Sequence, residues 1–296
     1  MARPSILAVV LCGVLFAGFA RADTSRVERG KYLLYAGGCI TCHTDIKTLK
    51  AKGPILGGGE AIKTPFGIFY GPNITPHKVR GIGRWREVDF IHAMREGRSP
   101  SGHNYFPSFP YTSFTKITDN DLKALWAYMR TLKPVDRPSR RHDLNFPFNS
   151  RFMVRFWKWL NFRRGPTHAD RTRSKQWNRG AYLVTALGHC GECHTPRGPL
   201  GGVYKRLALS GVRTFPDGIF PNITPDKATG IGQWSASDIV SVLKLGILPD
   251  GDFVSAEMVD VVEHGTSHLS DSDLKSIAVY LKSVKPIRNK TLSTKK

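Results

Sequence analysis

Two five-residue segments of this sequence carry the same arrangement of cysteine and histidine. They are Cys39-Ile-Thr-Cys42-His43 and Cys190-Gly-Glu-Cys193-His194. Cysteines three residues apart project from one side of a helical turn, so each thiol can add to one vinyl group of a haem. The histidine that follows can bind the haem iron from the proximal side as a neutral imidazole. The motifs therefore predict two covalently bound haem c groups. The predicted thioether cysteines and proximal iron ligands are Cys39, Cys42, His43, Cys190, Cys193 and His194.

Two other chemistries use closely spaced cysteines. A thioredoxin-like redox pair needs neither the following histidine nor a second copy of the motif. A zinc site needs two cysteine pairs close together, and here each pair lies in its own repeat. The fifth cysteine, Cys12, falls in a predicted leader, which leaves none for a structural disulfide. Haem attachment is the interpretation that accounts for both motifs.

The residues around the two motifs form an internal duplication. The matching segments are Arg29-Gly-Lys-Tyr-Leu33 with Arg179-Gly-Ala-Tyr-Leu183, Pro72-Asn-Ile-Thr-Pro76 with Pro221-Asn-Ile-Thr-Pro225, and Gly81-Ile-Gly-Arg-Trp85 with Gly230-Ile-Gly-Gln-Trp234. Each copy is predicted to contain a helix, a haem-binding turn, a long loop, a middle helix, a second loop and a closing helix.

The apolar spacing predicts helices as the main secondary structure. In the first closing segment Leu122, Leu125, Trp126 and Met129 recur at helical intervals. The connecting loops are rich in glycine and proline and show little alternation of polar and apolar residues. Loops this long are unusual in a compact domain unless something fills its centre, which a haem would do. We therefore predict an all-α fold with few helices around each haem.

Composition also divides the chain. A basic start, the apolar run 6–20 and the small residues of Ala20-Arg21-Ala22 predict a signal peptide over residues 1–22; a retained N-terminal anchor is the alternative. We expect the first haem domain at 23–137, a basic aromatic linker at 138–175, the second haem domain at 176–289 and a basic tail at 290–296.

The linker contains a predicted amphipathic helix. Phe152, Phe156 and Trp159 would share one face of it, with Arg151 and Arg155 nearby. One interpretation is an interdomain helix whose aromatic side chains are buried against both haem domains. The other is docking at a membrane interface, with the aromatics among the headgroups and the cations on phosphates.

The charge of the chain is strongly positive. Its 296 residues include 44 Lys and Arg against 23 Asp and Glu, a formal net charge of +21. Loss of Arg3 and Arg21 with the leader would lower this charge by two, to +19. Such a surface attracts anionic partners. Because an exported protein rarely meets nucleic acid, we expect an acidic redox partner or the outer face of an anionic membrane, and no nucleic acid.

These motifs resemble the cytochrome c subunits of membrane-associated bacterial dehydrogenases that oxidise alcohols, sugar acids, aldehydes or N-heterocycles. The resemblance covers nearly all of the predicted mature chain. Besides the repeated segments, it is carried by Thr64-Pro-Phe-Gly67, Phe109-Pro-Tyr111 and the run from Gly188 to Arg197. Several relatives carry three haems, whereas this chain has two attachment motifs.

The resemblance implies two tandem cytochrome c domains that relay electrons. The donor would be a flavin-, PQQ- or molybdenum-dependent dehydrogenase subunit, and the acceptor a quinone or terminal oxidase of the respiratory chain. The implied location is the periplasm, at or near the outer face of the inner membrane.

The resemblance also guides the choice of distal ligands. A thioether ligand stabilises Fe(II) and raises the haem potential, which suits a relay. Cytochromes of this fold usually place that ligand before the closing helix, where the second repeat has Met258. Met258 is therefore the expected distal ligand of haem two.

The first repeat departs from this pattern. Its counterpart of Met258 is Phe109, where many relatives have methionine, and phenylalanine cannot bind iron. The resemblance suggests Met94 of the middle helix as a substitute, since relatives tend to have an aliphatic residue there. His103 is the alternative ligand, and Met94 would then only pack in the core. His92 or a vacant site also stays open.

Three functions from different classes follow. The first is an electron-transfer subunit with no catalysis of its own. The second is a self-contained dihaem enzyme, a peroxidase or sulfur-compound oxidase that uses haem one. The third is a basic binding protein whose function is its charge, a hypothesis that leaves the two haem motifs without a role.

Overall fold

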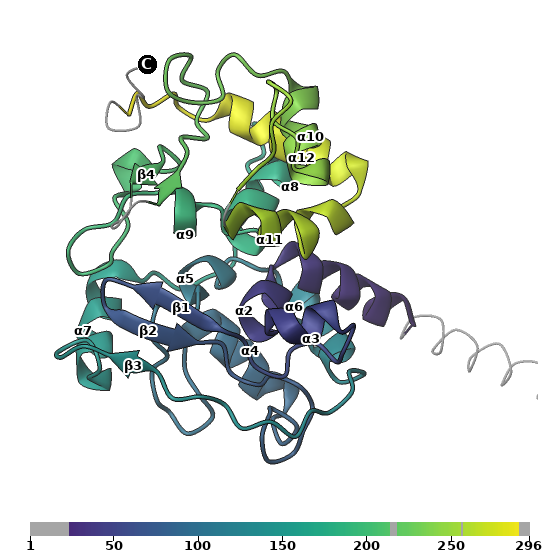
Figure 1. Cartoon of the computed structure of the whole chain (residues 1–296), viewed down its shortest axis with the longest axis vertical. Coiled ribbons are helices and arrows are strands. Elements are labelled where there is room, and N and C mark those ends of the chain that lie inside the picture. The colour runs from purple at the N-terminus through teal and green to yellow at the C-terminus, as the bar shows by residue number, and fades with distance from the viewer. Residues whose placement is uncertain (1–23, 214–217, 256, 290–296) are drawn as a thin grey trace, which may run out of the picture.

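The computed structural model describes residues 24–213, 218–255 and 257–289. The predicted leader at 1–22 and the predicted tail at 290–296 lie outside these residues. Two helical units follow one another along the chain, with the first in the lower half of Figure 1 and the second in the upper half. No helix of the described residues is long and apolar enough to cross a bilayer.

The first unit opens with a helix at residues 24–36. The elements that follow are α2 (Cys39–His43), α3 (Ile46–Lys50), β1 (Ala61–Thr64), β2 (Gly67–Tyr70), α4 (Glu87–Glu96), α5 (Tyr111–Phe114) and α6 (Asp119–Met129). α4 and α6 are the predicted middle and closing helices. The predicted inner face of α6, with Leu122, Leu125, Trp126 and Met129, is buried.

The segment that opens each repeat lies at a close helix crossing. A Cβ atom at Gly30 would stand 2.0 Å from the carbonyl oxygen of Ala124, so only glycine allows the 24–36 helix to lie this close to α6. Beside it, Arg29 Nη2 and Asp121 Oδ1 form an ion pair at 2.5 Å. The first and last helices of the unit are thereby fixed against each other.

The second unit repeats this plan. Its elements are α8 (Lys175–Tyr182) with a π-helical continuation η1 (Leu183–Leu187), α9 (Gly191–His194), the 3-10 turn η2 (Lys205–Leu207), β4 (Val212–Arg213), β5 (Ile219–Phe220), α10 (Ala236–Leu245), α11 (Glu257–Glu263), the 3-10 turn η3 (Thr266–His268) and α12 (Asp271–Ser283). A Cβ at Gly180 would stand 1.9 Å from the carbonyl oxygen of Ser276 in α12. Arg179 Nη2 pairs with Asp273 Oδ2 at 2.6 Å.

The two units are tied together by a reciprocal pair of hydrogen bonds. Tyr32 of the first unit donates to Asp273 of the second at 2.5 Å. Tyr182 of the second unit donates to Asp121 of the first at 2.7 Å. Each aspartate therefore accepts from an arginine of its own unit and a tyrosine of the other.

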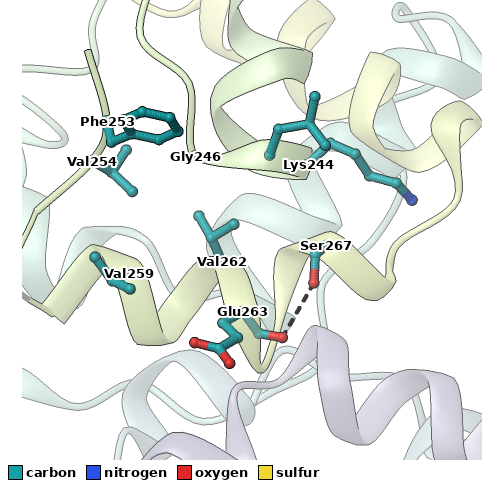
Figure 2. Close-up of a pocket in the computed structure, with 9 residues that line it drawn as sticks. Lys244, Gly246, Phe253, Val254, Val259, Val262, Glu263 and Ser267 are labelled. Carbon is teal, nitrogen blue, oxygen red and sulfur yellow. Dashed lines mark hydrogen bonds between the residues drawn. The ribbon is translucent and has the colours of Figure 1, made fainter.

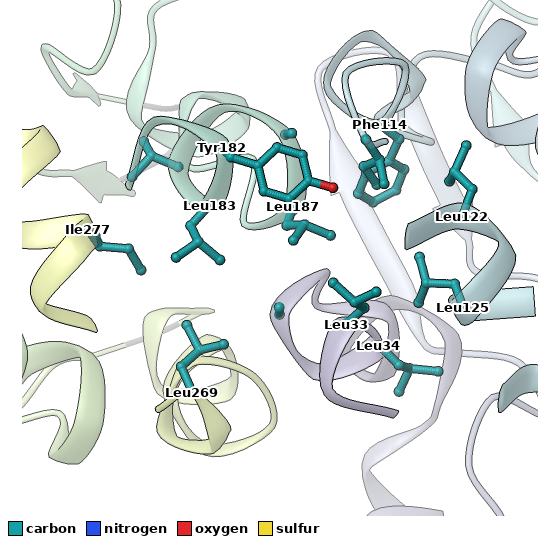
Figure 3. Close-up of a cluster of buried hydrophobic side chains, with 14 of the residues drawn as sticks. Leu33, Leu34, Phe114, Leu122, Leu125, Tyr182, Leu183, Leu187, Leu269 and Ile277 are labelled. Carbon is teal, nitrogen blue, oxygen red and sulfur yellow. The ribbon is translucent and has the colours of Figure 1, made fainter. Parts of the chain in front are cut away.

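One hydrophobic core runs through both units. Figure 3 shows Leu33 and Leu34 of the opening helix facing Leu122 and Leu125 on one side, while Leu183, Leu187, Leu269 and Ile277 come from the second unit. The inner sides of the opening and closing helices of both units contribute to it. The units are consequently packed as one body around a shared core.

The linker lies on the first unit. It contains β3 (Asp143–Leu144), which pairs with β2, and α7 (Arg151–Asn161). Val154 of α7 is buried against Phe69 and Phe106 of the first unit. Phe152 and Trp159 share a face as expected, but they are exposed, so the interpretation that buries them between two domains is wrong.

The prediction of an all-α fold is correct for the main elements but misses two small sheets. β1, β2 and β3 form an antiparallel three-stranded sheet, and β4 pairs with β5. Only Phe69 is buried among the residues of β1 and β2. Because hardly any of these side chains enter a core, no alternating pattern marks the strands in the sequence.

Candidate haem sites

The first motif forms a short helix behind a glycine turn. Gly38 has φ of 60°, a left-handed conformation that glycine adopts easily, and α2 starts directly after it. Cys39 is half-buried and Cys42 is exposed, and both are free thiols. The second motif forms a similar turn, α9, in which His189 with φ of 35° stands in the place of Gly38, Cys190 is half-buried and Cys193 is exposed. The structure thus places both cysteines of each motif on one short helical turn, as expected.

The thiols lack the properties of a redox-active pair. Burial raises the pKa of Cys39 and of Cys190 to about 12. Reactive redox cysteines have lowered pKa values, because the thiolate is the nucleophile. Within the described residues, no three His, Cys, Asp or Glu side chains come together to hold a metal. The interpretation of the motifs as thioredoxin-like redox pairs therefore loses support.

The two histidines are held in identical orientations. His43 Nδ1 lies 2.7 Å from the carbonyl oxygen of Pro72, and His194 Nδ1 lies 2.7 Å from that of Pro221. A proton on Nδ1 is thereby engaged, which leaves the lone pair on Nε2 free for a metal. Burial lowers the pKa of both imidazoles, which favours their neutral, ligating form. These residues fit the proximal side of a haem.

The carbonyls that orient the histidines belong to the repeated Pro-Asn-Ile-Thr-Pro segment. Asn73 follows Pro72, and its amide nitrogen donates to the carbonyl oxygens of Val135 and Arg137 at 2.8 and 2.9 Å. Its Oδ1 accepts from the backbone and the hydroxyl of Thr75. The repeat is visible in the sequence, 29 residues after His43 in the first unit and 27 after His194 in the second, and this recurrence was the available signal for its role.

Asn222 plays the same part in the second unit. Its amide nitrogen donates to Ile287 and Thr229, and its Oδ1 accepts from Thr224. Each histidine-orienting proline is therefore anchored to the segment that follows the closing helix of its own unit.

Glycines let the loop approach the first motif. A Cβ at Gly71 would stand 1.7 Å from the carbonyl oxygen of Cys42, and one at Gly59 would stand 2.0 Å from it. Gly59 and Gly71 are hydrogen-bonded to each other at the open end of the β1–β2 hairpin, so both arms of the hairpin contact the backbone of the motif there. This close packing fixes α2 while its cysteine side chains stay free.

The loops opposite the histidines have the same backbone register in both units. Gly97 and Gly246 end α4 and α10 in left-handed conformations. Tyr105 N then donates to Gly97 O, and Val254 N donates to Gly246 O, each at 2.8 Å. These matching hydrogen bonds support an alignment of the two repeats in which Gly97 corresponds to Gly246 and Tyr105 to Val254.

In that register Phe109 and Met258 occupy equivalent positions. Phe109 is surrounded by aromatic rings, with Tyr105 and Phe114 at centroid distances of 5.7 and 5.8 Å. Met258 lies on the first turn of α11 and is partly exposed. The expected loop position of Met258 is thus the start of a short helix that precedes α12.

The other candidates for haem one lie apart from each other. Met94 is buried on α4 and packs in the main core, at the position equivalent to Leu243 of α10. His103 lies on an exposed turn, with Nδ1 2.9 Å from the hydroxyl of Ser101. His92 is exposed on α4. Met94 is the only one of these three side chains that is buried.

The two motifs lie near each other across the interface. Besides burial and Glu192, the charge of Cys42 contributes to the raised pKa of Cys193. Glu192, inside the second motif, accepts hydrogen bonds from Ser113 at 2.9 Å and Thr112 at 3.1 Å, both on α5. The loop that contains Phe109 in the first unit therefore touches the haem motif of the second.

A surface pocket lies elsewhere in the second unit. It opens between the end of α10 and α11, and its wall includes Lys244, Phe253, Val259 and Val262 (Figure 2). None of the motif residues lines it, nor does Met258. We do not assign it to the candidate haem sites.

Comparisons with known proteins agree with this geometry. Residues 27–133 match the family model for cytochrome c. The chain is 43% identical over 275 residues to a diheme cytochrome c-type protein of Cereibacter sphaeroides, covering 92% of this chain and 89% of that protein.

Two further relatives are subunits of dehydrogenases. The chain is 39% identical to the fructose dehydrogenase cytochrome subunit of Gluconobacter japonicus, over 90% of this chain and 54% of that protein. It is 37% identical to the alcohol dehydrogenase (quinone) cytochrome c subunit of Gluconacetobacter polyoxogenes, over 94% of this chain and 60% of that protein. The chain thus spans little more than half the length of these two subunits.

Proposed function

This chain belongs to the dihaem cytochrome c family, and we propose that it relays electrons from a partner dehydrogenase through two covalently bound haems to the respiratory chain. The observation that carries the proposal is the paired arrangement of His43 with Pro72 and His194 with Pro221, each at 2.7 Å. An imidazole held through Nδ1 and presented through Nε2 suits a permanent iron ligand.

Each unit would hold one haem through its own motif. When bound, each haem iron supplies one-electron oxidation and reduction between Fe(III) and Fe(II). Cys39 and Cys42 would anchor haem one, and Cys190 and Cys193 haem two. The carbonyls of Pro72 and Pro221 hold the proton on the histidine Nδ1 atoms. Two one-electron carriers match the two electrons that an alcohol or sugar releases on oxidation.

We assign Met258 as the distal ligand of haem two. Its support is the shared backbone register, which places Met258 before the closing helix in the position of Phe109. For haem one we assign Met94, with His103 as the alternative. Met94 is buried in the same hydrophobic core as Ile40 of the first motif, whereas His103 is exposed.

The units are arranged so that one haem could pass its electron to the other directly. Glu192 of the second motif is hydrogen-bonded to α5 of the first unit. Burial raises the pKa of the Glu192 carboxyl, but Arg197 and the hydrogen bonds outweigh burial and lower it. A fixed negative charge thus joins the second motif to α5 and helps to hold the two units together.

The partner and the location follow from the relatives and the charge. A dehydrogenase of the flavin, PQQ or molybdenum type would be the electron donor, since the relatives are named as subunits of fructose and quinone-linked alcohol dehydrogenases. The net charge of +21 would guide docking to an acidic donor face. The protein would work in the periplasm, next to the outer face of the inner membrane.

One observation favours a second candidate, a dihaem redox enzyme such as a peroxidase or sulfur-compound oxidase. Phe109 replaces the iron-binding side chain at the expected distal position of haem one. If no other residue binds, that iron would be open to a small substrate. Hydrogen peroxide turnover by the purified protein would favour this candidate over the relay.

The relay is tested with the exported chain. Its mass should exceed that of the polypeptide by two haems, and acid acetone should extract no colour. Cys190→Ala/Cys193→Ala should remove one haem and Cys39→Ala/Cys42→Ala the other. In a deletion strain, oxygen uptake driven by one dehydrogenase substrate should fall, and the parent chain but neither variant should restore it. Normal oxygen uptake on every tested substrate would contradict the relay.

A further inference from the structure

The helix α7 has the reverse of the usual orientation for a surface helix. Normally the apolar face of such a helix packs on the protein and the polar face meets water. In α7 the outward face carries Phe152, Phe156, Trp159, Leu160 and Met153, all exposed. Phe152 and Trp159 expose 75% and 71% of their surface. An aromatic surface of this kind is costly in water and indicates that something covers it.

The inward face fixes this orientation through polar contacts. Lys158 Nζ donates to the carbonyl oxygen of Glu96 and, at 2.9 Å, to Asn104 Oδ1. It also lies 5.0 Å from the ring centre of Tyr111, and burial lowers its pKa to about 8. Trp157 Nε1 donates to the carbonyl oxygen of Leu200 in the second unit at 2.8 Å. The helix is anchored to both units and cannot simply roll its aromatics inward.

The segment that contains α7 carries cations and no acid of its own, and the nearby Glu96 is paired with Arg164 at 2.9 Å. Arg155 is exposed on the helix, and Arg151 and Arg163 stand at its two ends. No aspartate or glutamate occurs between residues 144 and 169. In Figure 1, α7 lies at the edge of the molecule, beside β2 and β3. A surface that approached α7 would therefore meet aromatic rings surrounded by cations.

We propose that the outward face of α7 docks on the surface of a membrane that contains anionic lipids. Phenylalanine and tryptophan side chains suit the boundary between headgroups and acyl chains, and arginines suit lipid phosphates. An 11-residue helix is too short to span a bilayer but can lie in its surface. A protein partner would be expected to offer acidic groups opposite the arginines at fixed points, whereas anionic lipids supply negative charge around the whole face.

The proposal goes beyond the electron relay, and its test does not depend on haem chemistry. The exported, haem-loaded chain is floated with vesicles of phosphatidylcholine alone or mixed with phosphatidylglycerol. Binding is expected only to the mixed vesicles and should weaken with salt, because exposed charges are screened. Phe152→Ser/Phe156→Ser/Trp159→Ser should weaken binding at least about tenfold, since all three rings would leave the interface.

Matched variants separate this face from general charge and apolarity. Arg155→Glu/Arg163→Glu should also weaken binding about tenfold or more, since each cation near an anionic surface contributes. Lys123→Glu, at an exposed position of α6, and Val79→Ser, in a loop with 67% of Val79 exposed, should bind like the parent. The haem spectrum and thermal midpoint of every variant should equal those of the parent.

Three results would overturn the proposal. One is a parent chain that does not bind anionic vesicles. Another is an equal loss of binding in the Val79→Ser control. The third is an aromatic triple variant that still binds vesicles but no longer sustains dehydrogenase-driven oxygen uptake, which would assign the face to a protein partner.

Discussion

The two units keep the same arrangement around the motif histidines and differ on the opposite side. His43 and His194 each lie 2.7 Å from the carbonyl oxygen of an equivalent proline. The asparagine after each proline donates from its side-chain amide to a backbone carbonyl beyond the closing helix. Across from the histidines, one loop presents Phe109 among aromatic rings. The other presents a methionine at the start of a helix. The histidine, the carbonyl that orients it and the asparagine after that carbonyl are thus the same in both units, whereas the distal residue differs.

This comparison has a physical reason. The proximal hydrogen bond comes from a main-chain carbonyl, so only a movement of the backbone would remove it. The distal position depends on one side chain at the end of a loop. Its replacement alters ligation and leaves the fold intact. Variants that exchange or remove these side chains can test how far the two units differ.

The largest expected effect comes from Met258→Ala. Removal of the thioether should leave haem two without its distal ligand, so that haem should become high-spin and bind carbon monoxide. Its potential should fall, because a thioether stabilises Fe(II). Visible spectra with and without carbon monoxide, and a redox titration, would measure this. If haem two of the variant stays low-spin with an unchanged potential, Met258 is not its ligand.

Met94→Ala separates ligation from packing in the first unit. If Met94 is a ligand, ferric haem one should show the absorption band of a thioether–iron bond. The Met94→Ala variant should lose this band, and only haem one of the variant should bind carbon monoxide. As a core residue, 6% exposed, its removal should cost about 2–5 kcal/mol of stability with ligation unchanged. His103→Ala is the control, since high-spin haem one in that variant alone would identify His103 as the ligand. If haem one of the parent already binds carbon monoxide, neither Met94 nor His103 is its distal ligand.

The reciprocal bonds between the units are predicted to differ in strength. Tyr182→Phe should destabilise the protein by about 1–3 kcal/mol, since it removes a partner from Asp121 and from the backbone N–H of Thr118. The Asp121 side chain is only 2% exposed, against 11% for Asp273. Tyr32→Phe removes one partner of Asp273 and the acceptor of the Ser270 backbone N–H, and because Asp273 is more exposed it should cost less. Denaturant unfolding of both variants would check this order, and equal losses would contradict it.

The sequence predicted the parts of this molecule that local spacing determines. Two cysteines and a histidine on one helical turn, and apolar residues three and four apart in the closing helices, are patterns within one segment. The contacts between distant segments could not be predicted. Nothing near Tyr32 in the sequence indicates that its hydroxyl reaches Asp273 of the other unit.

The same limit explains the prediction that failed in the linker. The spacing of Phe152, Phe156 and Trp159 correctly predicted one shared face. Periodicity alone cannot tell which face meets the protein, and the usual preference for buried aromatics pointed the wrong way. Here Lys158 and Trp157 decide the orientation through hydrogen bonds to residues far away in the chain.

The smallest expected effect concerns a contact that exists only in the first unit. Asp45 caps α3 by accepting from Thr48 N at 2.7 Å and pairs with Arg137, whereas the second unit has Pro196 after the matching threonine. The hydrogen bond from the Thr48 backbone and the Arg137 side chain lower the pKa of Asp45 to about 2. Its ionised form thus stabilises the fold above the ordinary aspartate pKa of about 4, and this contribution is lost as the pH falls toward 2.

Asp45→Ala should cost about 0.5–2 kcal/mol at neutral pH, the usual value for a lost helix cap. Unfolding of both proteins between pH 6 and about pH 2 should show the difference disappear at the acid end; a constant difference would mean that the Asp45 charge contributes nothing.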